Sequence, residues 1–406
     1  MEECSRAAGA APHGEELALV CMTVIGLGYL FPIAAIWAAF DYWEVLFPGR
    51  NIEFSASIVY QVASIFTVGA LSLSRSVRLR RRILFGFGGQ FVCLAVILAF
   101  RWLVLPPDAL FAVLLSLIAL CAVATGHLDS ALLSLCSQYS SRMQQHLQIG
   151  IGLGILASVL YRDLTKVLFP GAVADATSLF FVVALATILV CVASYEILMS
   201  LPVSARVREP QSGTSTSVAL LAEERGNDEG GSAHPLAVWR IVWRNQLAVL
   251  LNFAFCTTVY PGLVTSVPCR QFTALKSANW FQELLLTAFS TADIVGRFLT
   301  GRRFGLHHGN ILSTIVVRAV VFPLLLFCIA SPGATDLASA LVVLVAGFSN
   351  GYCLSLALVV VNEVPGLSEE QRKTCGRISA CSASAGLLVG SLSAAWVAEA
   401  FGLASG

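Results

Sequence analysis

Ala292-Asp293-Ile294-Val295-Gly296-Arg297 places an acid and a base four residues apart inside an otherwise apolar segment. A charge at hydrocarbon depth costs roughly 2.5–3.5 kcal/mol on insertion scales, so such a pair is rarely kept without a use. The spacing puts both side chains on one face of a helix, where each partly compensates the other. The pattern indicates a polar site that faces a bundle interior or a water-filled path, as in a transporter.

The composition of the whole chain is typical of a protein that lies mostly in lipid. Of its 406 residues, 57% are hydrophobic and 12% charged, whereas soluble domains have about 25% charged residues. The net charge of +1 argues against a nucleic-acid partner. Neither the 12 cysteines nor the six histidines show the spacing of a metal site or of a nucleophile–base set. We therefore expect no cofactor, no metal and no enzymatic activity.

Eleven apolar stretches are long enough to cross a bilayer, which needs about 20 residues per helix. They fall at 17–40, 55–74, 83–105, 109–138, 149–169, 177–201, 245–267, 280–300, 308–330, 336–361 and 375–402. The sequence therefore predicts an all-α integral membrane protein with 11 transmembrane helices. Arg162, Asp163 and Lys166 lie in the outer third of the fifth stretch, so either this helix is short or these charges reach the headgroups.

A long polar insertion separates the first six stretches from the last five. Its composition, most polar at 223–231, cannot bury enough apolar surface to fold by itself. We predict a cytoplasmic N-terminal tail at 1–16, a six-helix half at 17–201, a flexible cytoplasmic loop at 202–240 and a five-helix half at 241–406. Bundles of two six-helix halves are a common transporter plan, and six plus five is a truncated version of it.

The arginines of the short loops predict the orientation in the membrane. The loops after the second, eighth and tenth stretches carry most of these cations, and alternating helices place these loops on one side. The N-terminus is then cytoplasmic, and the C-terminus, after an odd number of spans, is extracellular. No retention signal is visible, so we expect the plasma membrane. The oligomeric state is not indicated.

Three charged residues lie deep inside the apolar stretches. For Asp293 and Arg297 the alternatives are a lining of the transport path or a structural clamp between helices. Asp129, near the middle of the fourth stretch, is too short to reach the headgroups. It either faces a cavity or pairs with Arg297 or Arg318 and holds helices together.

Other polar and aromatic residues favour less specific roles. Arg318, followed by Pro323, predicts a kinked helix with an inner polar contact. Glu283 and Asp41 lie near the ends of their stretches and are expected at solvated rims. Trp37 lies deeper than the interfacial aromatic belt and is a candidate for contact with the cavity.

Five motifs, taken together and in order, resemble the equilibrative nucleoside transporter family. The stretch from Asp293 to Arg297 is similar to that family's Asp-x-x-Gly-Arg signature in the eighth helix. The other matches are Gly26-Leu27-Gly28 with Pro32 in the first helix, Tyr260-Pro261 in the seventh, Arg318 with Phe322-Pro323 in the ninth, and Gly347-Phe348-Ser349-Asn350-Gly351-Tyr352 in the tenth. Each motif is weak alone, but five in the right order across nearly the whole chain are specific.

The resemblance implies a major-facilitator-like 6+5 bundle with the substrate held between its halves. It further implies facilitative movement of nucleosides or nucleobases by alternating access. Asp293 and Arg297 would contact sugar hydroxyls or fix the geometry around them. The residues assigned to substrate binding are Asp293, Arg297, Asp129, Trp37, Ile33 and Ser290, and those assigned to structure or gating are Arg318, Asn350 and Pro32.

Two departures from the family pattern leave the substrate range open. Many members have Pro-Trp-Asn in the first helix, where this chain has Pro32-Ile33-Ala34; Trp37, one turn along, is a partial substitute. Many members have Gln in the fourth helix where this chain has Asp129. Gln both donates and accepts hydrogen bonds, whereas an ionised Asp only accepts. A buried carboxyl group can also exchange a proton, so a proton-coupled mode and transport of another small polar solute stay open as alternatives.

Overall fold

The computed structural model is a bundle of long helices. It describes residues 2–39, 42–43, 46–48, 52–73, 79–103, 106–169, 172–205, 207, 235–277 and 280–401, and nearly all of these are helical. The predicted all-α fold class is therefore confirmed. Asp41 and most of the predicted loop at 202–240 lie outside the described residues.

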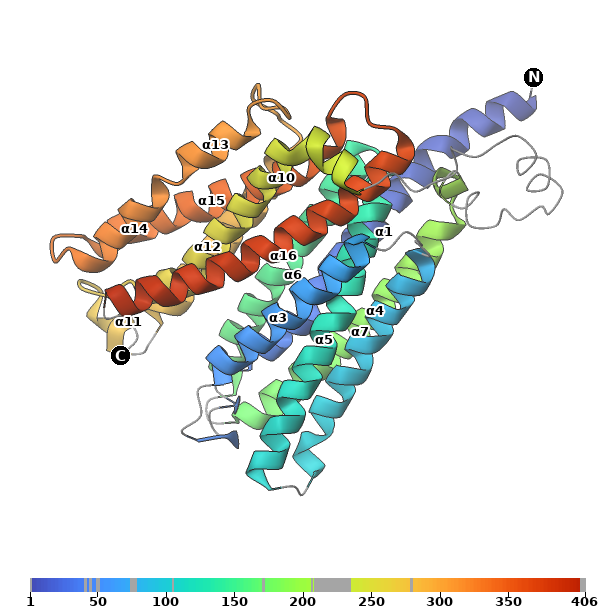
Figure 1. Ribbon diagram of the computed structural model, residues 1–406. Coiled ribbons are helices and arrows are strands. Elements are labelled where there is room, and N and C mark those ends of the chain that lie inside the picture. The colour runs from blue at the N-terminus through green and yellow to red at the C-terminus, as the bar shows by residue number, and fades with distance from the viewer. Residues whose placement is uncertain are drawn as a thin grey trace.

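The first part of the chain forms six long helices. These are α1 (Glu2–Ala38), α3 (Ile52–Leu73), α4 (Leu79–Leu98), α5 (Pro107–Cys136), α6 (Ser141–Leu168) and α7 (Val173–Ser200), with short 3-10 turns at Ala99–Trp102 and Pro202–Ser204. α1 packs against α6 and α7, and α5 packs against α3 and α4. Because α1 already begins at Glu2, the segment predicted as a tail is helical from there on and continues into the first span (Figure 1).

Close contact between α1 and α6 depends on glycine. A Cβ atom on Gly150 would collide with the carbonyl oxygen of Thr23, and one on Gly26 would collide with that of Leu147. Small residues at such positions let two helix backbones approach each other. Glycines of the fifth stretch thus serve the packing of α6 on α1.

The second part of the chain forms the other half of the bundle. Its elements are α10 (Pro235–Thr258), a π-helical turn at Val259–Leu263, α11 (Thr273–Ser277), α12 (Phe281–Leu299), α13 (Ile311–Arg318), α14 (Val321–Ala330), α15 (Asp336–Val360), a 3-10 turn at Val361–Glu363 and α16 (Glu369–Ala400). α10 packs against α16, and α12 packs against α15. α10 begins inside the segment predicted as a loop.

All eleven predicted stretches correspond to helices, although one of them is unusually polar. Ten helices in the described part of the chain are long and apolar enough to cross a membrane. The eighth stretch corresponds to α12, whose 19 residues include Glu283, Asp293 and Arg297. These charges make α12 less apolar than its neighbours, and it is the eleventh long segment of the bundle.

The ninth stretch is broken into two helices at the place that Pro323 dictates. A proline has no N–H to donate to the carbonyl four residues earlier, and its ring clashes with that carbonyl. The interruption between α13 and α14 lies at Ala319 and Val320, four and three residues before Pro323. The predicted kink is confirmed, and it leaves Arg318 as the last residue of α13.

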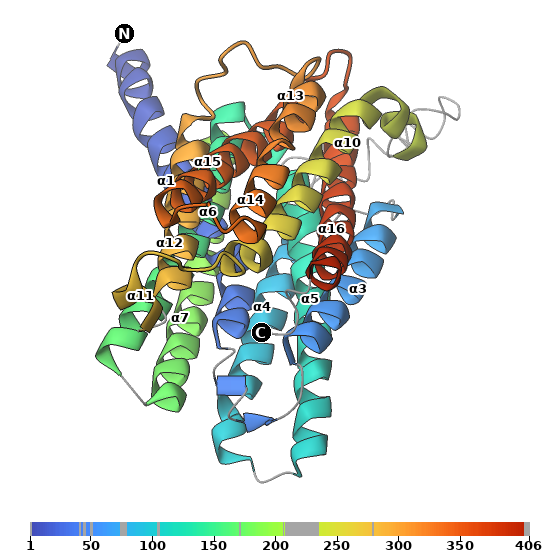
Figure 2. The ribbon, with the colours of Figure 1, turned by 90° about the vertical axis from the view of Figure 1, so that its left-hand side faces the viewer.

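The two halves lie side by side and inclined to each other (Figures 1 and 2), and in Figure 1 the start of α1 and the end of α16 lie at opposite ends of the bundle. Contacts between the halves run from α6 to α12 and α15, and from α16 to α3 and α5. Hydrogen bonds at the predicted cytoplasmic ends join the halves. Ser72 Oγ donates to the Arg377 carbonyl at 3.0 Å, and Gln145 Nε2 donates to the Phe298 carbonyl at 3.0 Å.

The opposite ends of α6 and α12 are joined by charged groups that we expected at the membrane rim. Arg162 Nη2 lies 3.1 Å from Glu283 Oε1, and Thr287 Oγ1 donates to Asp163 Oδ2 at 2.6 Å. Glu283 is buried, so the prediction of a solvated rim position was wrong for this residue. Arg162 and Asp163 of α6 therefore contact α12, where the Glu283 carboxylate and the Thr287 hydroxyl are their partners.

Candidate functional site

A cavity of about 190 Å³ lies between the two halves of the bundle. α1, α3, α5 and α6 line it from one half, and α10, α12, α15 and α16 from the other. Its charged lining residues are Asp129, Asp293 and Arg297. Pockets for drug-sized ligands are larger, roughly 300–1,000 Å³, so the cavity suits a compact solute.

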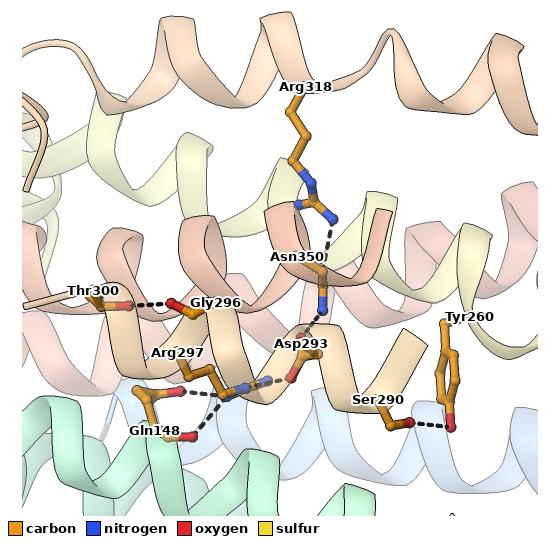
Figure 3. Close-up of polar contacts among 9 residues, drawn as sticks. All are labelled: Gln148, Tyr260, Ser290, Asp293, Gly296, Arg297, Thr300, Arg318 and Asn350. Carbon is orange, nitrogen blue, oxygen red and sulfur yellow. Dashed lines mark hydrogen bonds and ion pairs between the residues drawn. The ribbon is translucent and has the colours of Figure 1, made fainter. Parts of the chain in front are cut away.

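Asp293 and Arg297 form the ion pair that their spacing predicts. Arg297 Nε lies 2.6 Å from Asp293 Oδ2, and both side chains are buried. Arg297 also crosses to the other half of the bundle, where Nη1 donates to the carbonyl of Gln148 at 3.0 Å and to its Oε1 at 3.3 Å (Figure 3). The pair therefore lines the cavity and joins α12 to α6, so lining and clamping are not exclusive.

Asn350 connects this pair to a second arginine. Its Nδ2 donates to Asp293 Oδ1 at 2.7 Å, and its Oδ1 accepts from Arg318 Nη2 at 2.9 Å (Figure 3). Arg318 also donates through Nη1 to Asn252 Oδ1, and its guanidinium carbon lies 4.4 Å from the centre of the Phe255 ring. The amide of Asn350 thus links the Asp293 carboxylate to the Arg318 guanidinium through one hydrogen bond to each.

The polar network extends from α6 through α12 and α15 to α13 and α10. It contains one carboxylate, Asp293, and two guanidinium groups, those of Arg297 and Arg318. Burying a charge is costly unless it is paired and hydrogen-bonded, and each of these three groups has such partners. Arg318 is not among the residues that line the cavity, which agrees with the structural role predicted for it.

Two glycines leave the space that the network occupies, because a side chain at either position would overlap it. A Cβ atom on Gly351 of α15 would overlap the carbonyl oxygen of Asp293. A Cβ atom on Gly152 of α6 would come within 2.5 Å of Arg297 Cδ. Only glycine therefore allows α15 to cross α12 at the carboxylate and allows the Arg297 side chain to lie against α6.

Asp129 lines the cavity from α5, on the wall opposite the network's half of the bundle. Its side chain is only partly buried. Within the described part of the chain it forms no hydrogen bond or ion pair, and so it pairs with neither Arg297 nor Arg318 there. Of the alternatives left open by the sequence, the cavity-facing position is the one observed.

Ser290 lines the cavity together with an aromatic pair. Its Oγ lies 3.4 Å from the hydroxyl of Tyr260, whose ring stacks on Phe289 with centroids 4.6 Å apart (Figure 3). The backbone of Tyr260 leaves helical geometry at φ −116° and ψ 131°. A residue before proline is biased toward such extended angles, so Pro261 accounts for the bend that sets this ring beside the cavity.

The first-helix candidates lie away from the cavity. Among the described residues, α1 contributes Tyr29 and Leu30 to the lining. Pro32 and Ile33 are buried among other side chains, and the Trp37 ring packs edge-on against Tyr60 with centroids 6.0 Å apart. The substrate-binding roles predicted for Ile33 and Trp37 are therefore not supported by contact with the cavity, whereas the structural or gating role of Pro32 stays a prediction.

Three residues of the site were not selected from the sequence. Gln148 precedes the apolar stretch drawn at 149–169, because α6 actually begins at Ser141. Asn252 is a lone amide inside an apolar stretch, and that isolation is the sequence feature by which it could have been selected. Tyr260 was quoted for its motif only. No group of three or more potential metal ligands occurs among the described residues.

The chain is similar to known transporters in sequence. The family model described as nucleoside transporter matches residues 115–400. The chain belongs to the nucleoside transporter family. It is 23% identical to the equilibrative nucleotide transporter 1 of Arabidopsis thaliana over 92% of this chain and 84% of that one, and 22% identical to the equilibrative nucleoside transporter 4 of Homo sapiens over 91% and 80%.

Solved structures show that this family member has the major-facilitator fold. The proton:xylose symporter XylE bound to 6-bromo-6-deoxy-D-glucose matches with a TM-score of 0.64 at 13% identity, over 96% of this chain and 89% of that one. The transporter FucP in the outward conformation matches with a TM-score of 0.57 at 13% identity, over 95% and 92%. The chain is thus a multi-pass membrane transporter of this fold and not an enzyme.

Proposed function

We propose that the protein carries nucleosides or nucleobases across a membrane by alternating access, with the cavity between its halves as the binding site. The observation that carries this proposal is the Asp293–Arg297 pair on the cavity wall, because it also touches the opposite half through Gln148. A solute bound there lies where the two halves meet. Movement of one half against the other around a fixed central site is the basis of alternating access.

The pair has hydrogen-bonding capacity left for a solute. Arg297 uses Nε and Nη1 within the protein, and no described residue accepts from its Nη2. A guanidinium has five N–H donors and a carboxylate about four acceptor sites. Neighbouring ribose hydroxyls both donate and accept, so they match an acid beside a planar donor fork.

The charges of the cavity favour an uncharged solute over a phosphorylated one. Two carboxylates and one guanidinium line it, which leaves no positive excess to hold a phosphate. The relatives include proteins named as nucleoside and as nucleotide transporters. For this chain the balance of charge supports nucleosides and nucleobases.

Transport is proposed to be facilitative and to need no cofactor. The location is proposed to be the plasma membrane, with the N-terminus cytoplasmic and the C-terminus extracellular. These proposals rest on the loop arginines and on the family names. The start of α1 and the end of α16 at opposite ends of the bundle support an odd number of crossings (Figure 1).

Uptake into liposomes that contain the purified protein tests the function. Labelled adenosine, guanosine, uridine and hypoxanthine are the probes, with a labelled hexose and protein-free liposomes as controls. We expect saturable uptake of at least one base or nucleoside and none of the hexose. If no purine or pyrimidine compound enters or competes, the cavity serves another small polar solute and the proposal is wrong.

A second candidate is proton-coupled transport of the same solutes. The observation in its favour is Asp129, a carboxyl group that faces the cavity and has no partner among the described residues. Such a group can bind and release a proton as the cavity opens to either side. The charged groups on the facing wall are Asp293 and Arg297, which are already engaged with each other.

A further inference from the structure

Asp129 differs from Asp293, the other carboxylate that lines the cavity, in having no hydrogen-bond donor among the described residues. Asp293 receives hydrogen bonds from Arg297 and Asn350. Asp129 receives none from the described part of the chain, yet it borders the same space. A carboxylate away from bulk water needs hydrogen-bond donors, and a solute bound in the cavity can supply them in place of water.

The lining on the Asp129 side of the cavity is mostly apolar, although Ser64, Tyr60 and Gln148 also border it. Tyr29, Leu30, Leu132 and Leu133 line the cavity from the same half of the bundle. Such side chains suit the two faces of a planar ring, whereas the carboxylate suits its edge. The sugar-directed pair belongs to the other half. If the ribose of a nucleoside lies at that pair, as the proposed function has it, its base lies toward Asp129.

We infer that Asp129 makes this site selective for guanine among the common nucleobases, an inference that rests on the proposed function. Two neighbouring N–H donors on one edge bind both oxygens of a carboxylate in parallel, which is the strong form of such contacts. Guanine presents that edge through its N1–H and its 2-amino group. The carboxylate, for its part, supplies two acceptors and no donor.

The other bases place an acceptor where the second donor is needed. Adenine has its amino group beside the N1 lone pair, and cytosine has its amino group beside the N3 lone pair. Hypoxanthine has a single N–H on that edge, and uracil has a single N–H between two carbonyl oxygens. A site that hydrogen-bonds a substrate group rejects analogues that lack it, because buried polar groups are then left unpaired. The order expected is guanosine, then inosine, then adenosine.

Competition against one labelled nucleoside in proteoliposomes tests the inference. Unlabelled guanosine should inhibit at a roughly tenfold or more lower concentration than inosine, the scale of one hydrogen bond to a charged group, and adenosine should be weaker still. In Asp129→Asn, which both donates and accepts, the preference should shift by a similar factor from guanosine toward adenosine. Asp129→Glu keeps the carboxylate and should keep the order of preference.

The matched control is Asp108→Asn, the same change in the first turn of the same helix, which should leave the order unaltered. The inference would be overturned, while nucleoside transport stands, if guanosine competes no better than inosine and adenosine or if the order is unchanged in Asp129→Asn. It would also be overturned if a quaternary ammonium ion, which pairs with a carboxylate by charge alone, competes more strongly than guanosine. Absence of any nucleoside uptake by the unaltered protein would instead overturn the proposed function. A thermal melting curve of each variant separates lost selectivity from lost folding.

Discussion

The two walls of the cavity differ in whether the protein supplies partners for their charged side chains. In the C-terminal half, Asp293, Arg297 and Arg318 are linked through Asn350, and each charge has protein partners. In the N-terminal half, Asp129 stands alone among the described residues. Charges that the protein itself satisfies hold helices in place, and a charge that it leaves unsatisfied is available to a solute. The predictions below test this contrast.

Arg297→Ala should abolish uptake and destabilise the protein most. Removing one partner of a buried ion pair leaves the other charge uncompensated, at a cost of about 3–5 kcal/mol, and the bridge to Gln148 is lost as well. Uptake and thermal melting of the purified variant check this. Arg302→Ala, an exposed arginine nearby, is the control. Normal uptake by Arg297→Ala at normal surface expression would remove the pair from the transport mechanism.

Arg318→Ala should reduce stability more than it changes substrate affinity. The arginine lies outside the cavity lining, and its loss leaves the acceptors on Asn252 and Asn350 without donors, at about 1–3 kcal/mol each. Melting temperature should fall while the KM of the remaining protein changes little. Arg318→Lys should not restore stability, because an ammonium lacks the planar fork. A raised KM with unchanged melting would show direct contact with the solute.

Gly351→Ala should push α15 away from α12. The added methyl group meets the carbonyl oxygen of Asp293, and overpacking of this kind costs about 1–3 kcal/mol. We expect a lower melting temperature and reduced uptake. Gly88→Ala is the matched control, since a Cβ atom there has nothing within 4 Å. Equal melting of the two variants would contradict the close crossing.

Asp129→Asn should leave stability unchanged or slightly raise it. Loss of an unpaired carboxylate removes a desolvation cost and breaks no contact with a described residue. The melting temperature of the ligand-free protein is the measurement, with Asp293→Asn as the opposing case. A large destabilisation by Asp129→Asn would mean that the acid holds helices together.

An imposed proton gradient should have the smallest effect. Under the facilitative mode, solute enters liposomes to the same final level whether the outside is neutral or acidic. The final internal concentration is measured at two outside pH values, for the unaltered protein and for Asp129→Asn. Accumulation above the outside concentration at acidic pH, abolished in the variant, would establish proton coupling through Asp129 in place of facilitation.

Sequence pattern revealed the long helices and the i,i+4 pair because both depend on local periodicity. It also predicted the break before Pro323, a property of the backbone. It did not reveal that Gln148 and Asn350 would be the partners of the pair, since those contacts depend on how α6 and α15 cross α12. It placed Ile33 at the cavity from a family motif and Trp37 from its depth in the first stretch, whereas the cavity touches α1 one to two turns earlier, at Tyr29 and Leu30.

The glycines between α12 and α15 have a mechanical consequence. Gly347 and Gly351 lie against the carbonyl oxygens of Phe289 and Asp293, and Gly296 lies against that of Phe348. These three close approaches, spaced at about one helical turn, constrain both sliding and rotation of α12 against α15. Asp293 and Asn350 are therefore held together as one unit of the C-terminal half, and a solute at the pair meets a wall whose two helices keep a fixed spacing.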